Sequence, residues 1–333
     1  MGISQPIELL PLAPVLSDYD IFAVAFSGGK DSMASLLDLI AKGAPLDKII
    51  LLHHDVDGED STLMDWPCTK AYCKAVADYL GLKILFSWKV GGFEGEMTRQ
   101  DSLTKPVKFE LSTGGTKEVG GQTGKKNTRM MFPQTAADLR TRWCSAYLKV
   151  DVGGKVLVHD PLFSSGKVLF LTGERAEESK SRSKYQTFLP HTSDLRNGKK
   201  TKRYIDHWRN VHGWSEQAVW DLIAKFKILP HPAYFLGWGR VSCLACIFGS
   251  ANQWATIQKF MPSYFKAISD YEVAFGVTIH RKLSVIENAA KGTPYDCDPK
   301  WLALAMSREF THPLYTPNWE LPAGAFGESN GPT

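Results

Sequence analysis

A short segment rich in glycine and hydroxyl side chains, Ser27 to Ser32, has the residue types of a phosphate-binding loop. Two adjacent glycines let the backbone approach a phosphate closely, and the amides at the start of a following helix would face the anion. Lys30 would add a positive charge, and serine hydroxyls would add hydrogen-bond donors. We therefore expect phosphate binding by Ser27, Gly28, Gly29, Lys30, Asp31 and Ser32. The alternative is a turn that merely joins a strand to a helix.

The residues on either side of this segment are typical of a strand and a helix. The apolar run 21–26 precedes the loop, and Gly43 follows as a helix stop signal. The loop does not match the common nucleotide-binding pattern, which needs a glycine, four residues and then Gly-Lys-Ser/Thr. The predicted helix has an apolar face made of Met33, Ala34, Leu36, Leu37 and Ile40.

Further strand and helix patterns predict an α/β fold. Residues 49–56, 83–88 and 168–172 are apolar runs typical of buried strands, and residues 67–80 have the pattern of a helix. Strands that alternate with helices favour a twisted parallel sheet with helices on both faces. Ligands of such sheets bind beyond the carboxyl ends of the strands, where Asp55 and the loop would lie.

The pattern becomes irregular between residues 91 and 133, and we predict a long, mobile insertion with a hairpin near 107–111. A helix is expected at 135–150. After about residue 181 the chain has helical, aromatic and proline-rich character, with no strand signal until about 239–242. These patterns predict a nucleotide-loop α/β domain over 1–190 and a mainly helical, cysteine-containing region over 191–333.

The overall composition excludes several classes of protein. The chain has 333 residues, a net charge of +4 and six cysteines. Six unevenly spaced cysteines do not suit a secreted disulfide scaffold, so we expect a reducing, cytoplasmic environment. The first sixteen residues contain three prolines and no basic start, unlike a secretory signal. No apolar stretch is long enough to span a bilayer, so no membrane partner is expected.

Two further polar segments are candidates for the same edge of the sheet. The segment 173–182 follows the fourth predicted strand and contains Arg175 and Arg182, which can bind phosphate or sulfate in a bidentate manner. Glu178 and Ser179 can orient these arginines or contact a sugar. The alternative is a charged helix start on a solvated face. The segment 142–149 contains a further arginine, cysteine and lysine.

The cysteines indicate a possible metal site. Cys243 and Cys246 form a C-x-x-C pair, and Cys144 lies in the segment 142–149. Three thiolates suit an iron–sulfur cluster, zinc is the competing metal, and a redox pair is a third option. Cys144 could instead be buried and inert, and Cys297 is a possible fourth ligand. Cys68 and Cys73 lie on different faces of one predicted helix, so we interpret them as structural.

These motifs together resemble the phosphoadenosine phosphosulfate (PAPS) reductase family of the PP-loop ATP pyrophosphatase superfamily, also called adenine nucleotide alpha hydrolase-like. The resemblance covers roughly residues 20–250 apart from the insertion. It rests on Ser-Gly-Gly-Lys-Asp-Ser at 27–32, R-x-C-x-x-x-L-K at 142–149, G-x-R-x-x-E-S-x-x-R at 173–182, W-x-x-x-x-V-W at 214–220 and R-V-x-C-x-x-C-I at 240–247. Such enzymes cut ATP between its first two phosphates and leave an adenylylated substrate.

The resemblance implies roles for particular residues. Lys30, Asp55 and Arg175 would be catalytic, with Asp55 near the ribose or Mg²⁺. The cluster or zinc would be held by Cys144, Cys243 and Cys246. Nucleotide binding is implied for Ser27, Gly28, Gly29, Lys30, Asp31, Ser32, Asp55, Gly173, Arg175, Glu178, Ser179 and Arg182, and substrate binding for Arg142, Lys149 and Arg182. The implied cofactors are ATP, Mg²⁺ and a 4Fe-4S cluster.

Other features bear on the substrate and the proton chemistry. The run 196–203 contains five cations, and the insertion adds more, so DNA is a possible substrate, although a solvated loop is the simpler interpretation. Trp208, Trp214 and Trp220 are expected in the core. His53, His54 and Asp55 are candidate general bases only because of their place at a strand end, whereas His191, His207 and His231 are expected to be structural.

Three functions remain open from the sequence. The first is adenylylation for sulfur transfer, similar to the adenylating subunit of DNA phosphorothioation systems, with a cysteine desulfurase or sulfur carrier as partner. The second is a PAPS or APS reductase that makes sulfite. Such reductases carry a Glu-Cys-Gly-x-His segment, which Cys297 and its neighbours match poorly. The third is a non-catalytic nucleotide-binding subunit, since a fold does not settle the chemistry.

Overall fold

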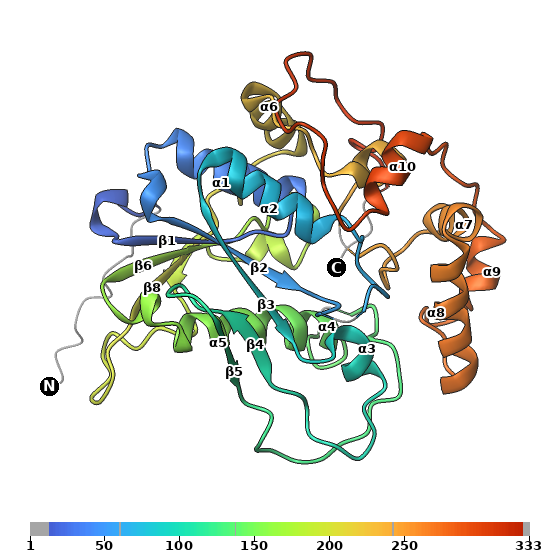
Figure 1. Cartoon of the computed structure of the whole chain (residues 1–333), viewed down its shortest axis with the longest axis horizontal. Helices are drawn as coiled ribbons and strands as arrows, with labels where there is room; N and C mark the ends of the chain where they lie inside the picture. The colour runs from blue at the N-terminus through green and yellow to red at the C-terminus, as the bar shows by residue number, and fades with distance from the viewer. Residues whose placement is uncertain (1–12, 60, 137, 242, 329–333) are drawn as a thin grey trace, which may run out of the picture.

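In the computed structural model, which describes residues 13–59, 61–136, 138–241 and 243–328, the chain forms an eight-stranded mixed sheet (Figure 1). The strand order is β5-β4-β3-β2-β1-β6-β8-β7. The five central strands β3, β2, β1, β6 and β8 pair in parallel, and β4, β5 and β7 are joined to the two edges by antiparallel pairs. The strands are β1 (Ile21–Ala25), β2 (Ile49–Asp55), β3 (Lys83–Lys89), β4 (Val107–Glu110), β5 (Thr116–Val119), β6 (Lys167–Leu171), β7 (Phe188–Pro190) and β8 (Tyr204–Trp208). The α/β fold class is confirmed.

Helices cover both faces of the sheet because its central strands are apolar on both sides. In β1, Phe22 and Val24 pack into one core, whereas Ile21 and Ala23 pack into the other. The helices α1 (Lys30–Ala41), α2 (Thr69–Leu80) and α6 (Glu216–Phe226) contribute to the first core, and α5 (Asp151–His159) contributes to the second. Figure 1 shows α1 and α2 above the sheet and α5 below it. The helix expected at 67–80 is confirmed, and Gly81 ends it with a φ of 67°.

The insertion at 91–133 contains regular structure. It includes α3 (Gly92–Met97) and the expected hairpin, in which β4 pairs with β5. The carboxylate of Glu96 is buried and makes ion pairs with Arg99 at 3.1 Å and with Arg129 at 2.7 Å. The pair with Arg129 links α3 to the irregular segment that follows β5.

The helix predicted at 135–150 is wrong in its first half. Residues 135–142 are not helical where the structure describes them (Ala137 lies outside the described residues), and helix begins only with α4 (Trp143–Ser145), a π-helical turn at Ala146–Val150 and α5. Gly153 and Gly154 weaken the helical pattern of α5 because glycine is a poor helix former.

The sheet also extends beyond the expected domain boundary near residue 190. Strand β8 pairs in parallel with β6 through Leu169 and Asp206 and through Phe170 and His207. The polar residues Asp206 and His207 are buried inside β8, so the apolar pattern of a buried strand is interrupted. No strand occurs at 239–241, and Ser242 lies outside the described residues.

The remaining C-terminal part is helical and packs against the N-terminal part. It contains α7 (Ala251–Phe260), α8 (Pro262–Phe275), α9 (Val285–Ala289) and α10 (Pro299–Ala305). Trp254 and Phe265 of this part share a hydrophobic cluster with Trp66 and Trp143 of the N-terminal part. Trp208 and Trp220 are buried in the core of the sheet, as expected, and Trp214 packs against it. None of the helices that the structure describes has the length and apolar character needed to cross a membrane.

Candidate functional site

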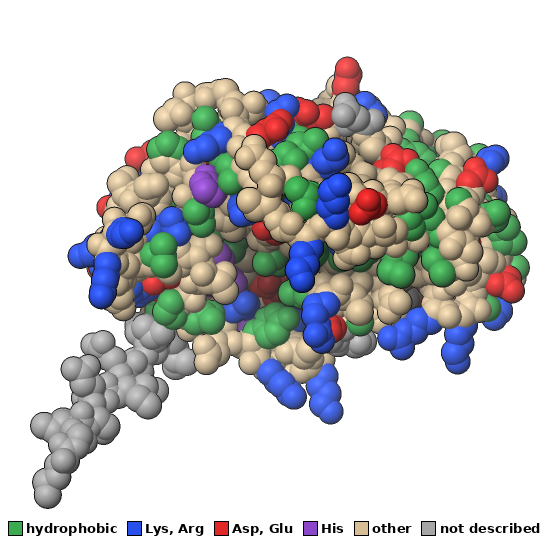
Figure 2. All heavy atoms as spheres, turned by 90° about the horizontal axis from the view of Figure 1, so that it is seen from below, with side chains coloured by type: hydrophobic (Ala, Val, Ile, Leu, Met, Phe, Trp, Pro, Cys, Tyr) green, Lys and Arg blue, Asp and Glu red, His purple; other side chains and the backbone are tan. Residues whose placement is uncertain are grey.

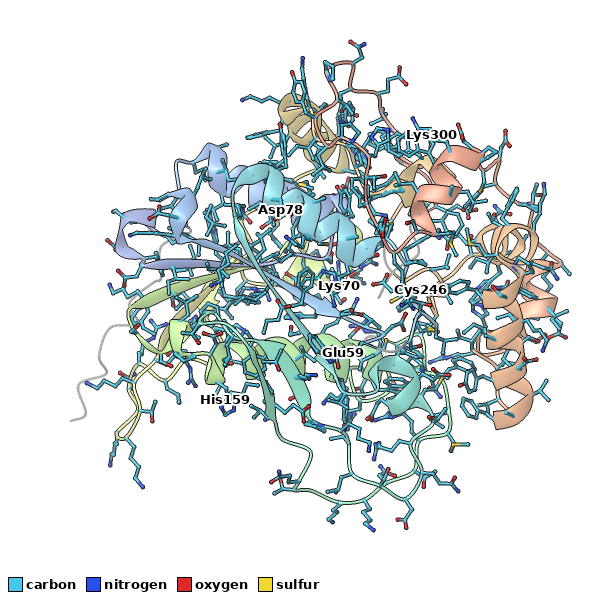
Figure 3. All side chains as sticks on the ribbon, viewed as in Figure 1. Glu59, Lys70, Asp78, His159, Cys246 and Lys300 are labelled. Carbon is cyan, nitrogen blue, oxygen red and sulfur yellow. The ribbon has the colours of Figure 1, made fainter. Side chains whose placement is uncertain are left out.

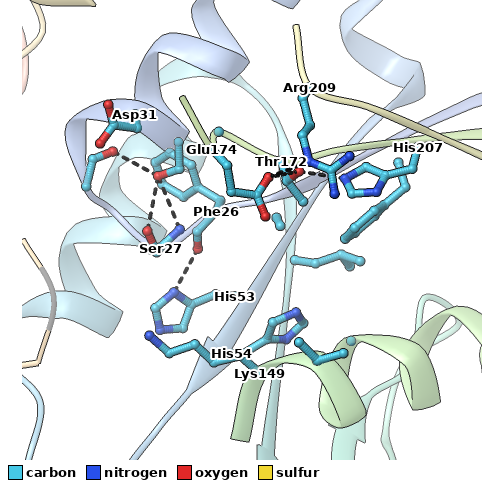
Figure 4. Close-up of a pocket in the computed structure, with 18 of the residues that line it drawn as sticks. Phe26, Ser27, Asp31, His53, His54, Lys149, Thr172, Glu174, His207 and Arg209 are labelled. Carbon is cyan, nitrogen blue, oxygen red and sulfur yellow. Dashed lines mark hydrogen bonds and ion pairs between the residues drawn. The ribbon is translucent and has the colours of Figure 1, made fainter. Parts of the chain in front are cut away.

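A cavity of about 510 Å³ lies at the carboxyl ends of the parallel strands β1, β2, β6 and β8 (Figure 4). The expected location of the site is therefore also the location of the larger cavity. Its wall includes several residues that the sequence singled out, namely Ser27, Gly29, Asp31, Ser32, Lys149, Gly173, Glu178, Arg182 and Cys243.

The backbone of the loop between β1 and α1 depends on glycine. Gly28 has a φ of 79°, and a Cβ atom there would lie 3.0 Å from the Sγ atom of Cys73. A Cβ atom on Gly173 would lie 2.5 Å from the carbonyl oxygen of Asp31. The end of β6 and the first turn of α1 can therefore approach each other only because residue 173 has no side chain.

Hydrogen bonds fix the conformation of the loop at 27–32. The Ser32 hydroxyl donates to the carbonyl oxygen of Gly29 at 2.8 Å, and the amide of Ser27 donates to the Ser32 hydroxyl at 3.3 Å. The amide of Lys30 donates to the hydroxyl of Tyr234 at 2.7 Å. Within the described part of the chain, the amides of Gly28 and Gly29 have no hydrogen-bond partner. These two donors, next to the first turn of a twelve-residue helix, can bind an anion.

Two residues predicted to be catalytic lie in ion pairs beside the cavity and do not line it. The Lys30 ammonium is 3% exposed, donates to the carbonyl oxygen of Gly239 at 2.9 Å and lies 3.4 Å from Glu216. Arg175 Nε donates to Asp31 Oδ1 at 2.6 Å. Burial disfavours the charge of Arg175, but Asp31 and other acidic partners outweigh burial and raise its pKa. The catalytic roles of Lys30 and Arg175 stay predictions.

Asp55, the third of these residues, lies in a neighbouring cavity of about 290 Å³. Its Oδ1 atom accepts the amides of Asp57 and Gly58, and its Oδ2 atom lies 3.7 Å from the Lys70 ammonium. Figure 3 labels Lys70 and Glu59, which both line this second cavity. The two cavities share His53 and Asp65 as wall residues.

Acidic side chains of the second cavity have altered proton affinity. Burial raises the pKa of Asp65 to about 7 and the pKa of Asp57 to about 6. Asp57 accepts the amides of Met64 and Asp65, so part of its role is to hold this turn. The Asp57 carboxylate therefore stabilises the turn, and its burial also disfavours its negative charge.

Three cationic side chains, Lys149, Arg182 and Arg240, line the larger cavity. Burial alone would lower the pKa of the Lys149 ammonium, but the surrounding Cys243, Cys144 and Asp65 outweigh burial and raise it. Arg182 forms an ion pair with Glu178, which also lies 3.7 Å from Arg240.

The two other predicted binding residues, Arg142 and Ser179, do not line the cavity. Arg142 is buried, donates to the carbonyl oxygen of Ala136 at 3.1 Å and does not line the cavity, and burial lowers its pKa. The Ser179 hydroxyl accepts the amide of Arg182 at 3.2 Å. Direct binding by these two side chains stays a prediction.

The three cysteines predicted to bind a metal are near one another but do not form a ready-made metal site. Cys243 lines the larger cavity, whereas Cys144 and Cys246 do not. All six cysteines are free, and burial raises the pKa of Cys144 and of Cys243. In the described ranges, no group of three or more His, Cys, Asp or Glu side chains is placed to hold a metal ion. As they stand, these residues do not fit a cluster, and we derive no step through one.

The positions of the remaining cysteines agree with structural roles. Cys246 lies in the connection between the 3-10 helix Pro232–Leu236 and helix α7 (Figure 3). Cys297 is 6% exposed, and its thiol contacts the carbonyl oxygen of Leu236 at 3.8 Å. Cys68 and Cys73 are fully buried. Cys297 does not line the larger cavity, so its position gives no support to a fourth ligand or a reductase nucleophile there.

Histidines contribute more to the cavity wall than the sequence indicated. The candidate bases His53 and His54 line the cavity, and burial lowers the pKa of both. His191 and His207, which were expected to be structural, line it as well. His231 is fully buried and accepts the amide of Ala233 through Nδ1, as a structural residue would.

Sequence reasoning missed Thr172, Glu174 and Arg209, which also line the cavity. Thr172 and Glu174 follow strand β6, and Arg209 follows strand β8. Strand β8 was not predicted from the sequence. Had it been, Arg209 would have been placed at the carboxyl edge of the sheet.

The basic run at 196–203 is partly structural. Arg196 pairs with Asp194 at 2.8 Å and lies over the ring of Tyr204, and Arg203 is buried and donates to the carbonyl oxygen of Ser193. The three lysines of the run are exposed. Lys and Arg side chains project from several places on the face shown in Figure 2, with acidic and apolar side chains between them. A DNA-binding role for this surface stays a prediction.

Comparison with known proteins adds little on function. No family model matches the chain. Over 141 residues the chain is 28% identical to an uncharacterized 37.8 kDa protein in the gpa 5′ region of Escherichia phage 186. The match covers 42% of this chain and 39% of the phage protein, so the chain spans less than half of that relative's length.

Proposed function

We propose that this protein is a PP-loop ATP pyrophosphatase of the PAPS reductase family, which activates a substrate by adenylylation for sulfur transfer. One observation carries the proposal. The amides of Gly28 and Gly29, which have no hydrogen-bond partner among the described residues, lie in a glycine-dependent loop whose Ser27, Gly29 and Ser32 line a cavity at the carboxyl edge of a parallel sheet. Such an arrangement suits a chain of phosphates.

The proposed reaction needs an in-line displacement at the α-phosphorus. A substrate oxygen attacks this phosphorus, the bond to the bridging oxygen of the β-phosphate breaks, and pyrophosphate leaves with that oxygen. The amides of Gly28 and Gly29 would stabilise the charge on the pyrophosphate, and Mg²⁺ would neutralise phosphate charge when bound. Asp55 and Asp65 are the carboxylates of the adjoining cavity that could meet such a cation.

The remaining cations would hold the substrate and the departing groups. Lys149 and Arg182 line the cavity and carry the charge that anionic groups require. In the second half of the reaction, the terminal sulfur of a persulfide from a cysteine desulfurase or carrier protein would displace AMP, so that the substrate oxygen leaves with the α-phosphate. A second thiol would then cleave the S–S bond between substrate and carrier, which releases the thiolated substrate and leaves the two thiols as a disulfide. DNA is the substrate class that we favour, because exposed lysines follow β7.

One observation favours a second candidate, a nucleotide-binding subunit without turnover. Lys30 and Arg175 are both engaged in ion pairs with protein carboxylates and do not line the cavity. If these pairs persist with nucleotide bound, neither side chain contacts the phosphates.

Release of pyrophosphate from ATP tests the proposal. We expect the purified protein with Mg²⁺, DNA and a cysteine desulfurase to release pyrophosphate and AMP, and the Ser32→Ala variant to lose most of this activity. The Ser307→Ala variant, altered at a partly exposed serine far along the chain, serves as the control. Tight ATP binding without release of pyrophosphate under all these conditions would favour the second candidate instead.

A further inference from the structure

We infer that the segment 322–328, the strap, is an autoinhibitory element that holds Lys30 away from the phosphates of the bound nucleotide. When the strap is released, the Lys30 ammonium is free to enter the larger cavity and pair with a phosphate. The inference rests on the proposed function, because it takes the phosphates to lie in the loop at 27–32. The structure describes the whole strap, and none of its residues lines the larger cavity, so the strap acts through Lys30 and not by covering the site.

Two residues of the C-terminal part hold Lys30 in its present position. The Lys30 amide donates to the hydroxyl of Tyr234 at 2.7 Å, and the Lys30 ammonium donates to the carbonyl oxygen of Gly239 at 2.9 Å. The residues on either side of Lys30 line the larger cavity, whereas Lys30 itself is buried and does not. The phosphate loop therefore keeps its own cation outside the cavity that the phosphates are proposed to occupy.

The strap packs directly against both residues that hold Lys30. The amide of Gly324 donates to the carbonyl oxygen of Tyr234 at 2.7 Å. A Cβ atom on Gly239 would lie 2.5 Å from the carbonyl oxygen of Gly327, and a Cβ atom on Gly324 would lie 2.4 Å from that of Trp238. The two backbones can therefore approach this closely only because residues 239 and 324 have no side chain. The positions of Tyr234 and Gly239 thus depend on the strap.

One carboxylate anchors the strap to the start of helix α7. Glu328 accepts hydrogen bonds from the Asn252 side-chain amide and the Tyr295 hydroxyl, both at 2.8 Å, and from the Ser250 hydroxyl at 2.5 Å. These hydrogen bonds outweigh burial and lower the pKa of Glu328. Hydrogen bonds to a charged group are stronger than those between neutral groups. Because Glu328 is exposed, water can replace its partners, so the anchor is reversible.

Release of the strap weakens the contacts that bury the Lys30 ammonium. Residues 237–241 contain no helix or strand, so the Gly239 carbonyl can move once Gly327 no longer packs against it. The other partner is Glu216, which lies 3.4 Å from the ammonium and has a side chain that is 19% exposed, so water can solvate it when the lysine leaves. The flexible stem of a lysine then allows the ammonium to exchange these partners for phosphate oxygens.

The coupling between the strap and the nucleotide must act in both directions. If Lys30 pairs with phosphate only when the strap is released, the apparent affinity for ATP is reduced by the fraction of molecules in which the strap is bound. ATP binding must in turn shift the strap towards its released state by the same factor. The inference therefore makes two separate predictions, one for nucleotide affinity and one for the exposure of the strap.

Isothermal titration calorimetry with ATP and Mg²⁺ tests the first prediction. Glu328→Ala removes the anchor, and Gly324→Ala places a Cβ atom against the carbonyl oxygen of Trp238, so the two variants release the strap by different means. In both we expect ATP to bind roughly 10-fold more tightly than in the wild type, which corresponds to about 1.4 kcal/mol. Addition of Lys30→Met should abolish the gain in both variants, whereas Lys30→Met alone should change the affinity of the wild type much less.

Glu320→Ala is the matched control for these variants. It removes an exposed carboxylate just before the strap, so it makes the same change in net charge as Glu328→Ala. We expect its ATP affinity to equal that of the wild type. Inorganic tripolyphosphate, which has phosphates but no nucleoside, should show the same gain in the two strap variants as ATP, because Lys30 pairs with phosphate.

Hydrogen exchange tests the second prediction. The amides of Gly324 and Gly327 donate to the carbonyl oxygens of Tyr234 and Gly324, and we expect both to exchange faster when the wild type binds ATP, but not when Lys30→Met does. Unchanged ATP affinity in both strap variants, or a gain that survives Lys30→Met, overturns the inference, while ATP binding by the wild type still supports the proposed function. Failure of ATP to bind to the wild type and to every variant overturns the proposed function and the inference together.

Discussion

The phosphate loop at 27–32 and the cysteine segment at 239–247 meet at one wall of the same cavity but reach it in different ways. The loop is shaped mostly by its own residues, through the positive φ of Gly28 and the hydrogen bonds of Ser32. The cysteine segment has no regular structure where it is described, and its position depends on contacts such as that of the Gly239 carbonyl oxygen with the Lys30 ammonium.

This difference indicates that the loop at 27–32, and not the cysteine segment, is preorganised for a ligand. Amides that are oriented by a strand, a turn and a helix need no further rearrangement to meet a phosphate. Thiols on an irregular segment are not yet gathered, and metal binding commonly supplies the free energy that gathers such ligands. We therefore expect nucleotide binding to be independent of any metal at the cysteines, and a metal site at the cysteines to form only with its metal.

The largest expected effect comes from breaking the loop with Gly28→Ala. The added Cβ atom would be strained at a φ of 79° and would meet Cys73 Sγ at 3.0 Å. We expect ATP affinity, measured by calorimetry, to fall by about 100-fold or more, which is about 3 kcal/mol. Gly43→Ala is the matched control, because Gly43 has a φ of 85° and nothing within 4 Å of an added Cβ. Equal losses of affinity in both variants would show that the loop has no special role.

Lys149 connects the two regions, since it lines the cavity and has the cysteines as neighbours. Lys149→Met removes a cation from the cavity wall, and we expect tripolyphosphate affinity to fall roughly 30-fold, about 2 kcal/mol. Lys149→Arg should retain part of the affinity. Lys155→Met, four residues before the end of α5, is the control. Unchanged affinity in Lys149→Met would place the anion elsewhere.

The free energy of unfolding should depend on pH in opposite directions through His207 and Asp65, which line different parts of the site. The pKa of His207 is about 2 in the folded protein, below the 6.5 of a free imidazole, so the unfolded state takes up the proton first. Stability from His207 is therefore lost as pH falls below about 6.5, by about 2 kcal/mol at pH 5. Asp65 has the opposite sign, because its folded pKa of about 7 lies above 3.8, and its contribution to stability grows as pH falls from 7 towards 4.

Urea unfolding at pH 7 and pH 5 measures both contributions. Between these values we expect His207→Gln to lose less unfolding free energy than the wild type, and Asp65→Asn to lose more. The same loss in all three proteins would contradict the assigned burial of these groups.

The smallest expected effect on nucleotide binding comes from Cys243→Ser. The loop does not use this thiol, so ATP affinity should stay within about threefold of the wild type, both before and after treatment with a chelator. Loss of ATP binding on chelation would show that the loop and the cysteine segment are one unit.

Much of the fold could be predicted because its signals are local. The apolar runs of β1, β2, β3 and β6 and the helix stop at Gly81 are visible in single stretches of sequence. Strand β8 was missed because buried Asp206 and His207 interrupt its apolar run. Each is stabilised by a distant partner: the hydroxyl of Tyr19 donates to Asp206 at 2.7 Å, and His207 contacts Thr172.

The sequence alone determined the loop and its place after the first strand, since two glycines, two serines and an apolar run act within a few residues of one another. Tertiary structure alone decided that Lys30 and Arg175 meet protein carboxylates, and that Thr172, Glu174, His207 and Arg209 line one cavity. The physical reason is distance along the chain. Backbone conformation follows from neighbouring residues, whereas the partner of a charge or an imidazole follows from which strands lie side by side.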